Sequence, residues 1–234
     1  WNDLSPRAAD PSKHYKVIAL DNRGTGRSSK PEGPYSMKTM ADDVAGLLTY
    51  LKIEKAHVFG GSMGGYIAQE MAIRHPEKVD ALILVCSTPG GKAWDLLGQR
   101  EAFEKLSWMY SPPSGMTEQE IIDEFFRIVY QPKYTEENYG QMMSLSTEYP
   151  TVTATYEKQM DACVNHDTPD RLSSIDARTL VIHGEDDVLL FPEGARMLAD
   201  NIPDASLIML KEAGHGVSEE KWDEIYPKIR AFLG

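Results

Sequence analysis

One serine in this 234-residue chain stands in a setting that could make it a nucleophile. The stretch AHVFGGSMGGYIAQE, residues 56–70, places Ser62 between an apolar run and a run of helical periodicity, with four glycines around it. The order strand, G-x-S-x-G, helix is the pattern of a sharp turn that holds a serine hydroxyl clear above a sheet. We expect Gly60 and Gly64 to make room for that turn, because a side chain at either position would collide with the neighbouring strand or helix.

The same turn predicts where negative charge could be stabilised. A carbonyl carbon attacked by Ser62 develops an oxyanion, and the first N–H groups of the following helix can face it. The backbone N–H of Met63 is the donor that the sequence assigns. A phosphate-binding turn is the alternative for a glycine-rich junction, but the turn has no lysine and lacks the G-x-G-x-x-G spacing.

A serine hydroxyl needs a base to remove its proton, so a histidine and an orienting acid are expected further along the chain. His215 lies in KEAGHGVSEE, a glycine-flanked loop between the last strand-like run and the last helical run. Three carboxylates in HGEDDVLLFPE are candidates for the acid: Glu185, Asp186 and Asp187. The remaining histidines fit packed or solvated positions better: His14, His57, His75, His166 and His183.

Five apolar, strand-like runs would position these residues. They span 16–20, 56–60, 81–86, 179–184 and 206–211, and runs of helical period separate them. Apolar runs of this kind are typical of strands covered on both faces. The alternation predicts an α/β fold, a mostly parallel sheet with flanking helices. The serine, acid and histidine loops then meet at the carboxyl edge of the sheet, where such folds bind ligands.

The alternation stops between Thr88 and about Asp176, where no strand-like run is found. We therefore expect a core of residues 1–88 and 177–234 and an inserted helical cap, or lid, at residues 89–176. A separate structural subdomain is the alternative for this insert.

The insert is rich in large apolar side chains. Residues 90–165 hold 16 of the 32 Phe, Trp, Tyr and Met residues in the chain, among them Trp94, Phe103, Trp108, Phe125, Phe126, Met142 and Met143. Part of this enrichment must serve the packing of the insert itself. A cap face lined by such residues favours a small to medium apolar or aromatic acyl group. If charged substrates are preferred instead, the specificity candidates become Arg100, Arg127 and Glu148.

The net charge and composition of the chain exclude some classes of binding partner. The formal net charge is −12 and the pI is about 4.9, which argues against nucleic acid or an anionic membrane surface. No apolar run approaches the length of about 18 residues that a membrane span needs. No His, Cys and carboxylate cluster has ligand spacing and no phosphate motif is present, so no metal or organic cofactor is expected. Two cysteines favour a reducing, cytoplasmic location; the expected partner is a small-molecule substrate, with a homodimer left open.

Four motifs, in the order in which the α/β-hydrolase superfamily has them, give the chain a resemblance to that superfamily: LDNRGTGRSSKP, GGSMGG, LVIHGEDDVLLFPE and KEAGHGVSEE. The resemblance covers nearly everything outside the insert and is with the serine esterase and lactonase branch. By the family's Gly-x-x-Asp spacing it implies that the acid is Asp187, with Asp186 as the fallback. It also implies that the loop containing Asp21, Arg23, Gly24 and Gly26 is structural. A serine at position 62 speaks against the epoxide hydrolase and haloalkane dehalogenase branches, which use a carboxylate nucleophile.

The chain departs from this family in one respect. The family's sheet has eight strands, and the five runs correspond to the fourth through the eighth. In that topology the third strand lies between the fourth and fifth, and the loop after it supplies a second oxyanion donor. The expectation is that about 40 to 60 residues upstream of Trp1 complete the sheet and carry that donor.

The residues and the resemblance together predict a serine hydrolase that cleaves a carboxylic ester or lactone. Ser62 would attack, His215 would act as base and Asp187 would orient it. Carbon–carbon bond hydrolysis, aminopeptidase activity, cofactor-free peroxidation and acyl transfer on the same fold are alternatives that the motifs do not separate. Two other classes stay open: a ligand receptor that retains the triad with little turnover, and a purely structural domain.

Overall fold

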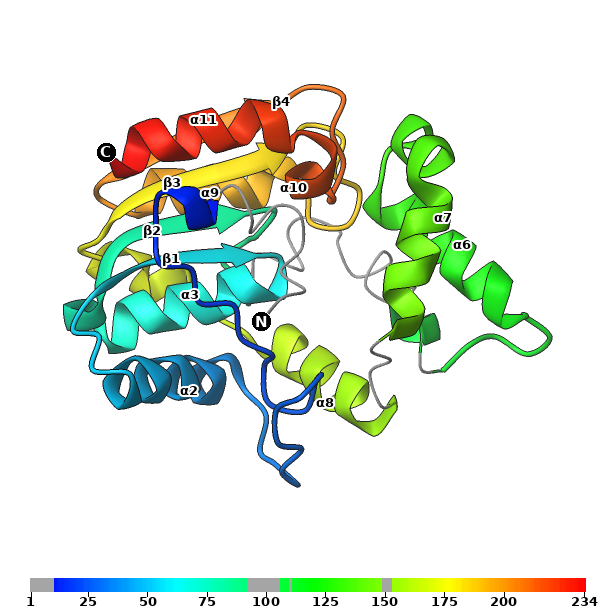
Figure 1. The fold of residues 1–234 in the computed structure, drawn as a ribbon, viewed down its shortest axis with the longest axis horizontal. Coiled ribbons are helices and arrows are strands. Elements are labelled where there is room, and N and C mark those ends of the chain that lie inside the picture. The colour runs from blue at the N-terminus through cyan, green and yellow to red at the C-terminus, as the bar shows by residue number, and fades with distance from the viewer. Residues whose placement is uncertain (1–10, 92–105, 110, 149–152) are drawn as a thin grey trace.

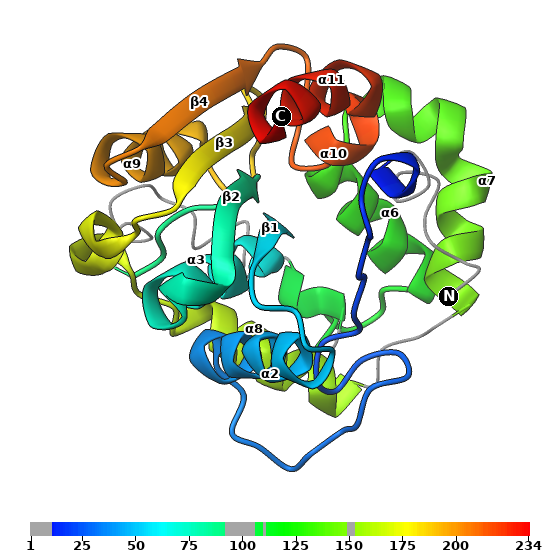
Figure 2. The same cartoon turned by 60° about the vertical axis from the view of Figure 1, so that its left-hand side comes forward.

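The computed structural model describes residues 11–91, 106–109, 111–148 and 153–234. Its sheet has four parallel strands in the order of the sequence (Figures 1 and 2). They are β1 (Ala56–Gly61), β2 (Val79–Val85), β3 (Arg178–Gly184) and β4 (Ala205–Leu210). This confirms the predicted α/β architecture, and four of the five predicted strands lie within two residues of their predicted bounds.

Each face of the sheet has its own layer of helices and its own core. On one face, Leu82, Leu84 and Val181 pack in a cluster with residues of α2 (Met37–Tyr50), α3 (Met63–Arg74) and α9 (Pro192–Asn201). On the other face, Ile83, Val85 and Ile182 pack with α10 (Val217–Glu220) and α11 (Trp222–Leu233). Because side chains alternate along a strand, burial on both faces requires the unbroken apolar runs seen in the sequence.

Local sequence sets the helix beginnings. Ser36 caps α2 by accepting a hydrogen bond from the N–H of Thr39 at 3.0 Å, which satisfies one of the otherwise free donors of the first turn. Along α2 the buried residues recur at the helical period: Met37, Met40, Ala41, Ala45 and Leu48. Three short 3-10 turns lie between these elements: η1 (Pro11–Lys13), η2 (Pro76–Lys78) and η4 (Pro169–Ser174), of which only η4 contributes a buried residue, Leu172.

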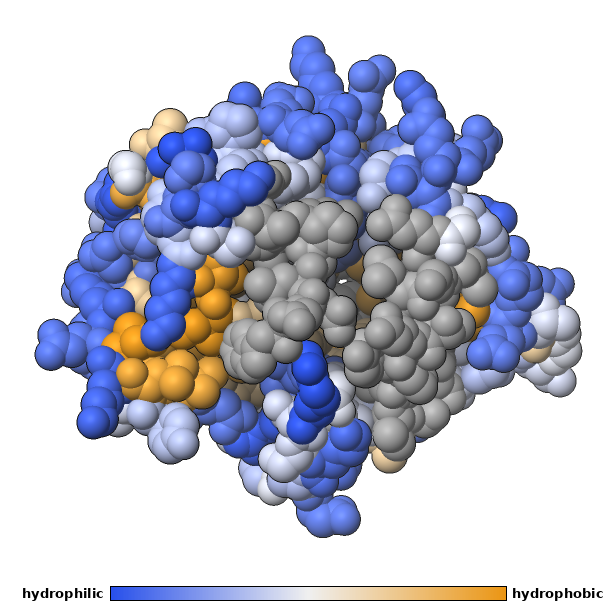
Figure 3. Space-filling view, in the orientation of Figure 1, coloured by the Kyte–Doolittle hydropathy of each residue, from blue (hydrophilic) through white to orange (hydrophobic). Residues whose placement is uncertain are grey.

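The predicted strand at residues 16–20 is wrong, because this segment forms no strand. Strand geometry needs a hydrogen-bonded neighbour, and in the described part of the chain β1 is the edge of the sheet with β2 as its partner. The edge position agrees with the exposure of Phe59 on β1, which is 48% exposed. Figure 3 shows an apolar area in the region of β1 and α3.

The insert between β2 and β3 is helical in its described parts, with η3 (Ser107–Met109), α6 (Glu118–Val129), α7 (Pro132–Glu148) and α8 (Thr153–Val164). Figure 1 shows α6 and α7 beyond the carboxyl ends of the strands, and α8 beneath them. Thr117 and Glu120 form a capping box that begins α6. Trp94, Arg100 and Phe103 lie outside the described residues, as do the side chains of Met142, Met143 and Glu148.

The two chain segments that connect the insert to the core lie side by side. The N–H of Gly91 donates to the carbonyl of His166 at 2.6 Å, and the N–H of Thr168 donates to the carbonyl of Pro89 at 3.0 Å. Gln69, fully buried on α3, binds both connectors: its Nε2 donates to the carbonyl of Thr88 at 3.0 Å and its Oε1 accepts from Oγ1 of Thr168 at 2.6 Å.

Among the described residues, no helix combines the length and the apolar character that crossing a bilayer requires.

Candidate active site

Ser62 occupies the turn between β1 and α3 at the carboxyl edge of the sheet. Its backbone angles are φ 51° and ψ −120°, a region that costs a residue with a side chain on the order of 1 to 3 kcal/mol. The neighbouring strand holds the turn in place, because the N–H of Ser62 donates to the carbonyl of Val85 at 2.9 Å. The sequence pattern of strand, glycine-flanked serine and helix therefore folds into the sharp turn that it predicts.

Two of the glycines in this turn are required by close contacts. A β-carbon at Gly60 would overlap the carbonyl of Gly64, and one at Gly65 would overlap the side chain of Ser87. The prediction for Gly64 itself is wrong, because a β-carbon there would meet nothing within 4 Å in the described chain beyond its own turn of helix. At position 64 the backbone contributes the carbonyl that crowds Gly60, while its own side chain position faces open space.

A chain of hydrogen bonds joins three of the predicted residues. Nε2 of His215 lies 2.9 Å from Oγ of Ser62, and Nδ1 of His215 lies 2.9 Å from Oδ2 of Asp187. A carboxylate only accepts hydrogen bonds, so Nδ1 carries the proton and Nε2 is left to accept from the serine hydroxyl. The three side chains come from the loops after β1, β3 and β4, which meet at one edge of the sheet.

The carboxylate of Asp187 is buried and fully engaged. Its Oδ1 accepts from the N–H groups of Leu189 and Leu190, each at 2.9 Å, and its Oδ2 faces His215 and His183. Burial by itself would raise the pKa of this carboxyl, but the charge of His215 and the hydrogen bonds from the two imidazoles lower it below its ordinary value. The site is therefore built to keep Asp187 ionised.

The other two carboxylates of the acid loop do not take part in this chain. Glu185 and Asp186 are exposed, and Oδ2 of Asp186 accepts a long hydrogen bond of 3.5 Å from the side chain of Gln131. The geometry thus places Asp187, and not the fallback Asp186, against His215.

His183 is a member of the site that the sequence analysis took for a packed strand residue. It has no exposed side-chain surface, and its Nε2 lies 3.0 Å from Oδ2 of Asp187 and 2.6 Å from the carbonyl of Leu190. The signal that could have found it is a single polar residue inside the apolar run TLVIHG, four positions before the acid.

The other histidines lie elsewhere. His75 contacts Asp42 at 2.7 Å on the surface, and the ring of His57 packs edge-on against Tyr15. His166 stacks on Tyr66, and burial lowers its pKa to about 3. These environments agree with packed or surface roles.

The loop predicted to be structural is held by its own side chains. Arg23 binds the carboxylate of Asp43 through two nitrogens at 2.6 Å each, and Asp21 accepts from the N–H of Arg27 at 2.9 Å. Side chains at Gly24 and Gly26 would overlap neighbouring atoms, and both have positive φ. The loop also touches the insert, because Nε2 of Gln159 donates to the carbonyl of Arg23 at 3.1 Å.

The remaining requirement is a donor for developing negative charge. Met63 is the first residue of α3, and the first N–H groups of a helix have no partner within it. The positive end of the helix dipole lies at the same point. The N–H of Met63 is thus in the part of the helix that suits an oxyanion.

One group of side chains in the described part of the chain could approach a metal ion. Ligand atoms of Cys86, His183 and Asp187 lie within 4.8 Å of one another. The oxygens of Asp187 already accept hydrogen bonds from four donors, and Sγ of Cys86 lies 3.9 Å from the carbonyl of Gly214. The donor set is therefore committed to protein partners.

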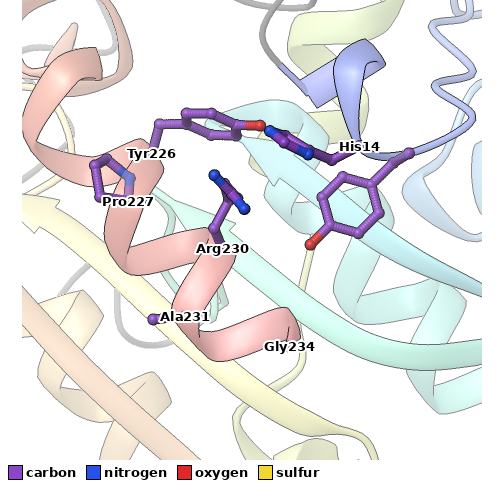
Figure 4. A pocket seen from close by; sticks show the side chains of 7 residues that line it. His14, Tyr226, Pro227, Arg230, Ala231 and Gly234 are labelled. Atoms are coloured by element: carbon purple, nitrogen blue, oxygen red, sulfur yellow. The ribbon is translucent and has the colours of Figure 1, made fainter.

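A cavity of about 530 Å³ lies between the beginning of the described chain and α11 (Figure 4). Its lining includes His14, Tyr15, Tyr226 and Arg230. None of the three hydrogen-bonded residues borders it, so this cavity is separate from the chemistry at Ser62.

Comparison with known proteins identifies the family of the chain. The alpha/beta hydrolase fold family matches residues 1–221. The chain is 31% identical to a proline iminopeptidase of Pestalotiopsis fici over 94% of this chain and 82% of that protein. It is 29% identical to a 2-hydroxymuconate semialdehyde hydrolase of Pseudomonas putida over 95% of this chain and 78% of that protein.

A solved structure gives the same result. The enol-lactonase of Burkholderia xenovorans LB400 superposes with a TM-score of 0.82 at 27% identity, over 98% of this chain and 85% of that chain. These three proteins are named for different activities, but the fold is shared. The protein belongs to the α/β-hydrolase family.

Proposed function

We propose that the protein is a serine hydrolase that cleaves a carboxylic ester or a lactone. The observation that carries this proposal is the hydrogen-bonded chain from Asp187 through His215 to Ser62. That chain puts a base within 2.9 Å of a serine hydroxyl, and the acid behind it holds the imidazole in the tautomer that can accept the proton.

In the proposed reaction, Ser62 Oγ attacks the carbonyl carbon while His215 Nε2 takes its proton. The N–H of Met63 donates to the oxyanion. His215 then delivers the proton to the leaving alkoxide, and the carbon–oxygen bond of the substrate breaks to leave an acyl-enzyme. Water attacks this intermediate with His215 again as base, which releases the acid and restores the serine.

We propose that the helical insert at residues 89–176 acts as a cap over the site. Its residue Tyr130 packs against Gly216, the neighbour of His215, and its aromatic side chains extend away from there through Phe126, Tyr134 and Tyr139. We propose that the less buried of these aromatic rings face the substrate, which would suit a small to medium apolar or aromatic acyl group. Arg127, a candidate for charge recognition, is instead paired with Glu124 at 2.6 Å.

Similarity to an enol-lactonase and to a 2-hydroxymuconate semialdehyde hydrolase supports carbonyl substrates. Similarity to a proline iminopeptidase keeps amide cleavage as the competing activity. Both cysteines, Cys86 and Cys163, are free and buried, which supports the proposed cytoplasmic location.

The test is labelling by a fluorophosphonate and turnover of p-nitrophenyl acetate in the wild type and in Ser62→Ala, His215→Ala and Ser218→Ala. The first two variants should lose both, and the third, a serine in the histidine loop that donates to Glu219, should keep them. Turnover that persists in Ser62→Ala would contradict the assignment. A panel of p-nitrophenyl esters, lactones, proline amides and a vinylogous diketone then separates ester and lactone hydrolysis from its competitors.

A further inference from the structure

The carboxylate of Glu220 bridges two segments that are far apart in the sequence. Its Oε1 accepts from the N–H of Gln131 at 2.6 Å, and its Oε2 accepts from the N–H of Gly214 at 2.9 Å. Gln131 belongs to the insert, between α6 and α7, and Gly214 immediately precedes His215. One side chain therefore holds both the insert and the loop of the candidate base.

The residue on the other side of His215 is also held by the insert. The N–H of Gly216 donates to the carbonyl of Val129 at 2.7 Å. The ring of Tyr130 lies against Gly216 so closely that a β-carbon there would overlap it. Both neighbours of His215 are thus fixed, one directly by the segment 129–131 and one through Glu220.

The environment of Glu220 differs from that of an ordinary surface glutamate. The residue is part-buried, and burial raises its pKa although the N–H groups of Gln131 and Gly214 and the charge of Lys221 act in the opposite direction. A carboxylate offers two acceptor oxygens, whereas the amide of glutamine offers one oxygen and would turn N–H groups toward a second donor. The position therefore needs both oxygens of a carboxylate.

We propose that Glu220 is a positioning residue, which fixes the backbone around His215 and couples it to the seating of the insert. This inference rests on the proposed function, in which His215 is the base. The hydrogen bonds of the Glu220 carboxylate go to the backbone of Gly214 and Gln131, so it acts on His215 through them. A displacement of about 1 Å in a catalytic group can lower the rate about 100-fold, so a loosened loop should affect the chemical step.

The test compares Glu220→Gln with Glu219→Gln, which removes the same charge from the adjacent residue. We expect Glu220→Gln to lower kcat and the rate constant of fluorophosphonate labelling by about 10- to 100-fold, while KM for a small ester changes by less than about threefold. Glu219→Gln should stay within about twofold of the wild type in both rates. Labelling of the folded protein reports on Ser62 and His215 without depending on the choice of substrate.

A second pair of variants tests the insert side. Gln131→Pro removes the N–H that donates to Glu220, and Gln131→Ala keeps it. The backbone can accept this proline, because Tyr130, with ψ 154°, already has the extended conformation that the residue before a proline prefers. Gln131→Pro should lower the labelling rate by part of the loss seen in Glu220→Gln. The double variant should label little more slowly than Glu220→Gln alone. Gln131→Ala should label at the wild-type rate.

Two results would overturn the inference. The first is a folded Glu220→Gln protein with lower thermal stability but a wild-type labelling rate, which would make Glu220 merely structural. The second is full additivity of Gln131→Pro and Glu220→Gln, which would show that the two groups do not act through one contact. A wild-type protein that the fluorophosphonate does not label would be a different failure, since it would remove the proposed function itself and this inference with it.

Discussion

Nε2 of His183 lies 3.0 Å from the same oxygen of Asp187 that His215 contacts at 2.9 Å. The acid is therefore held by two imidazoles, one buried in β3 and one in the loop after β4. Because Leu190 offers only a carbonyl to His183 at 2.6 Å, Nε2 of His183 must carry a proton and donate it. His183 thus orients the carboxylate from behind.

Replacement of His183 by phenylalanine should therefore weaken the orientation of Asp187 while preserving a ring in the core. We expect His183→Phe to lower kcat about tenfold with KM nearly unchanged, and to cost about 1 to 3 kcal/mol of stability because the Leu190 carbonyl loses its partner. Steady-state kinetics and urea unfolding measure the two effects. His75→Phe, a surface control, should alter neither kcat nor KM, and an unchanged kcat in His183→Phe would show that the carboxylate needs no second imidazole.

The two neighbouring aspartates of the acid loop should behave very differently. Asp187→Asn removes the acceptor of His215 and favours the wrong imidazole tautomer, so activity should fall by several orders of magnitude. Asp186→Asn, which alters an exposed residue with one long hydrogen bond to Gln131, should stay within about threefold of the wild type. A larger loss in Asp186→Asn than in Asp187→Asn would reverse the assignment of the acid.

The lowered pKa of Asp187 also predicts a pH dependence of stability. An acid whose pKa is lower in the folded state stabilises that state above its unfolded pKa of about 4, and this stabilisation is lost as the pH falls toward the folded pKa. The difference in melting temperature between wild type and Asp187→Asn should therefore be largest near pH 6 to 7 and shrink below about pH 4. Melting curves of both proteins from pH 3 to 7 measure it, and a constant difference would contradict the shift.

The glycines around Ser62 provide a matched pair. Gly60→Ala forces a β-carbon onto the carbonyl of Gly64 and should unfold the turn or destabilise the protein by several kcal/mol. Gly64→Ala meets only open space in a helix and should be neutral or stabilising by up to about 1 kcal/mol. Chemical denaturation compares the two. Equal destabilisation would mean that the turn needs glycine at 64 for another reason.

Much of the fold follows from the periodicity of the sequence. Four apolar runs form strands because each pairs with at least one neighbouring strand, and the central strands β2 and β3 are covered by helices on both faces. The run at 16–20 has the same composition but lacks a pairing partner in the described chain, so composition alone could not decide its structure. Pairing is a property of the whole sheet and cannot be read from one segment.

The candidate site could be predicted where its residues lie in loops that follow strand-like runs. Ser62, Asp187 and His215 each follow a strand-like run and stand among glycines or acidic residues, so their meeting could be expected from a parallel sheet. His183 and Glu220 carried no such signal, since one lies inside a strand and the other among several glutamates. The role of Glu220 depends on a contact across about 90 residues of sequence. The role of His183 depends on the exact turn of the loop that carries Asp187.

The paired connectors of the insert have a consequence for how this protein can change over evolutionary time. Gly91 and His166 are hydrogen-bonded neighbours, and Gln69 anchors both connecting segments to α3. The chain therefore enters and leaves the insert at adjacent points on the core. Insertions whose ends are adjacent are the ones that a host domain tolerates. Recombination at these two adjacent connectors can therefore exchange the segment between them while the strand order of the sheet and the turn that carries Ser62 stay unchanged.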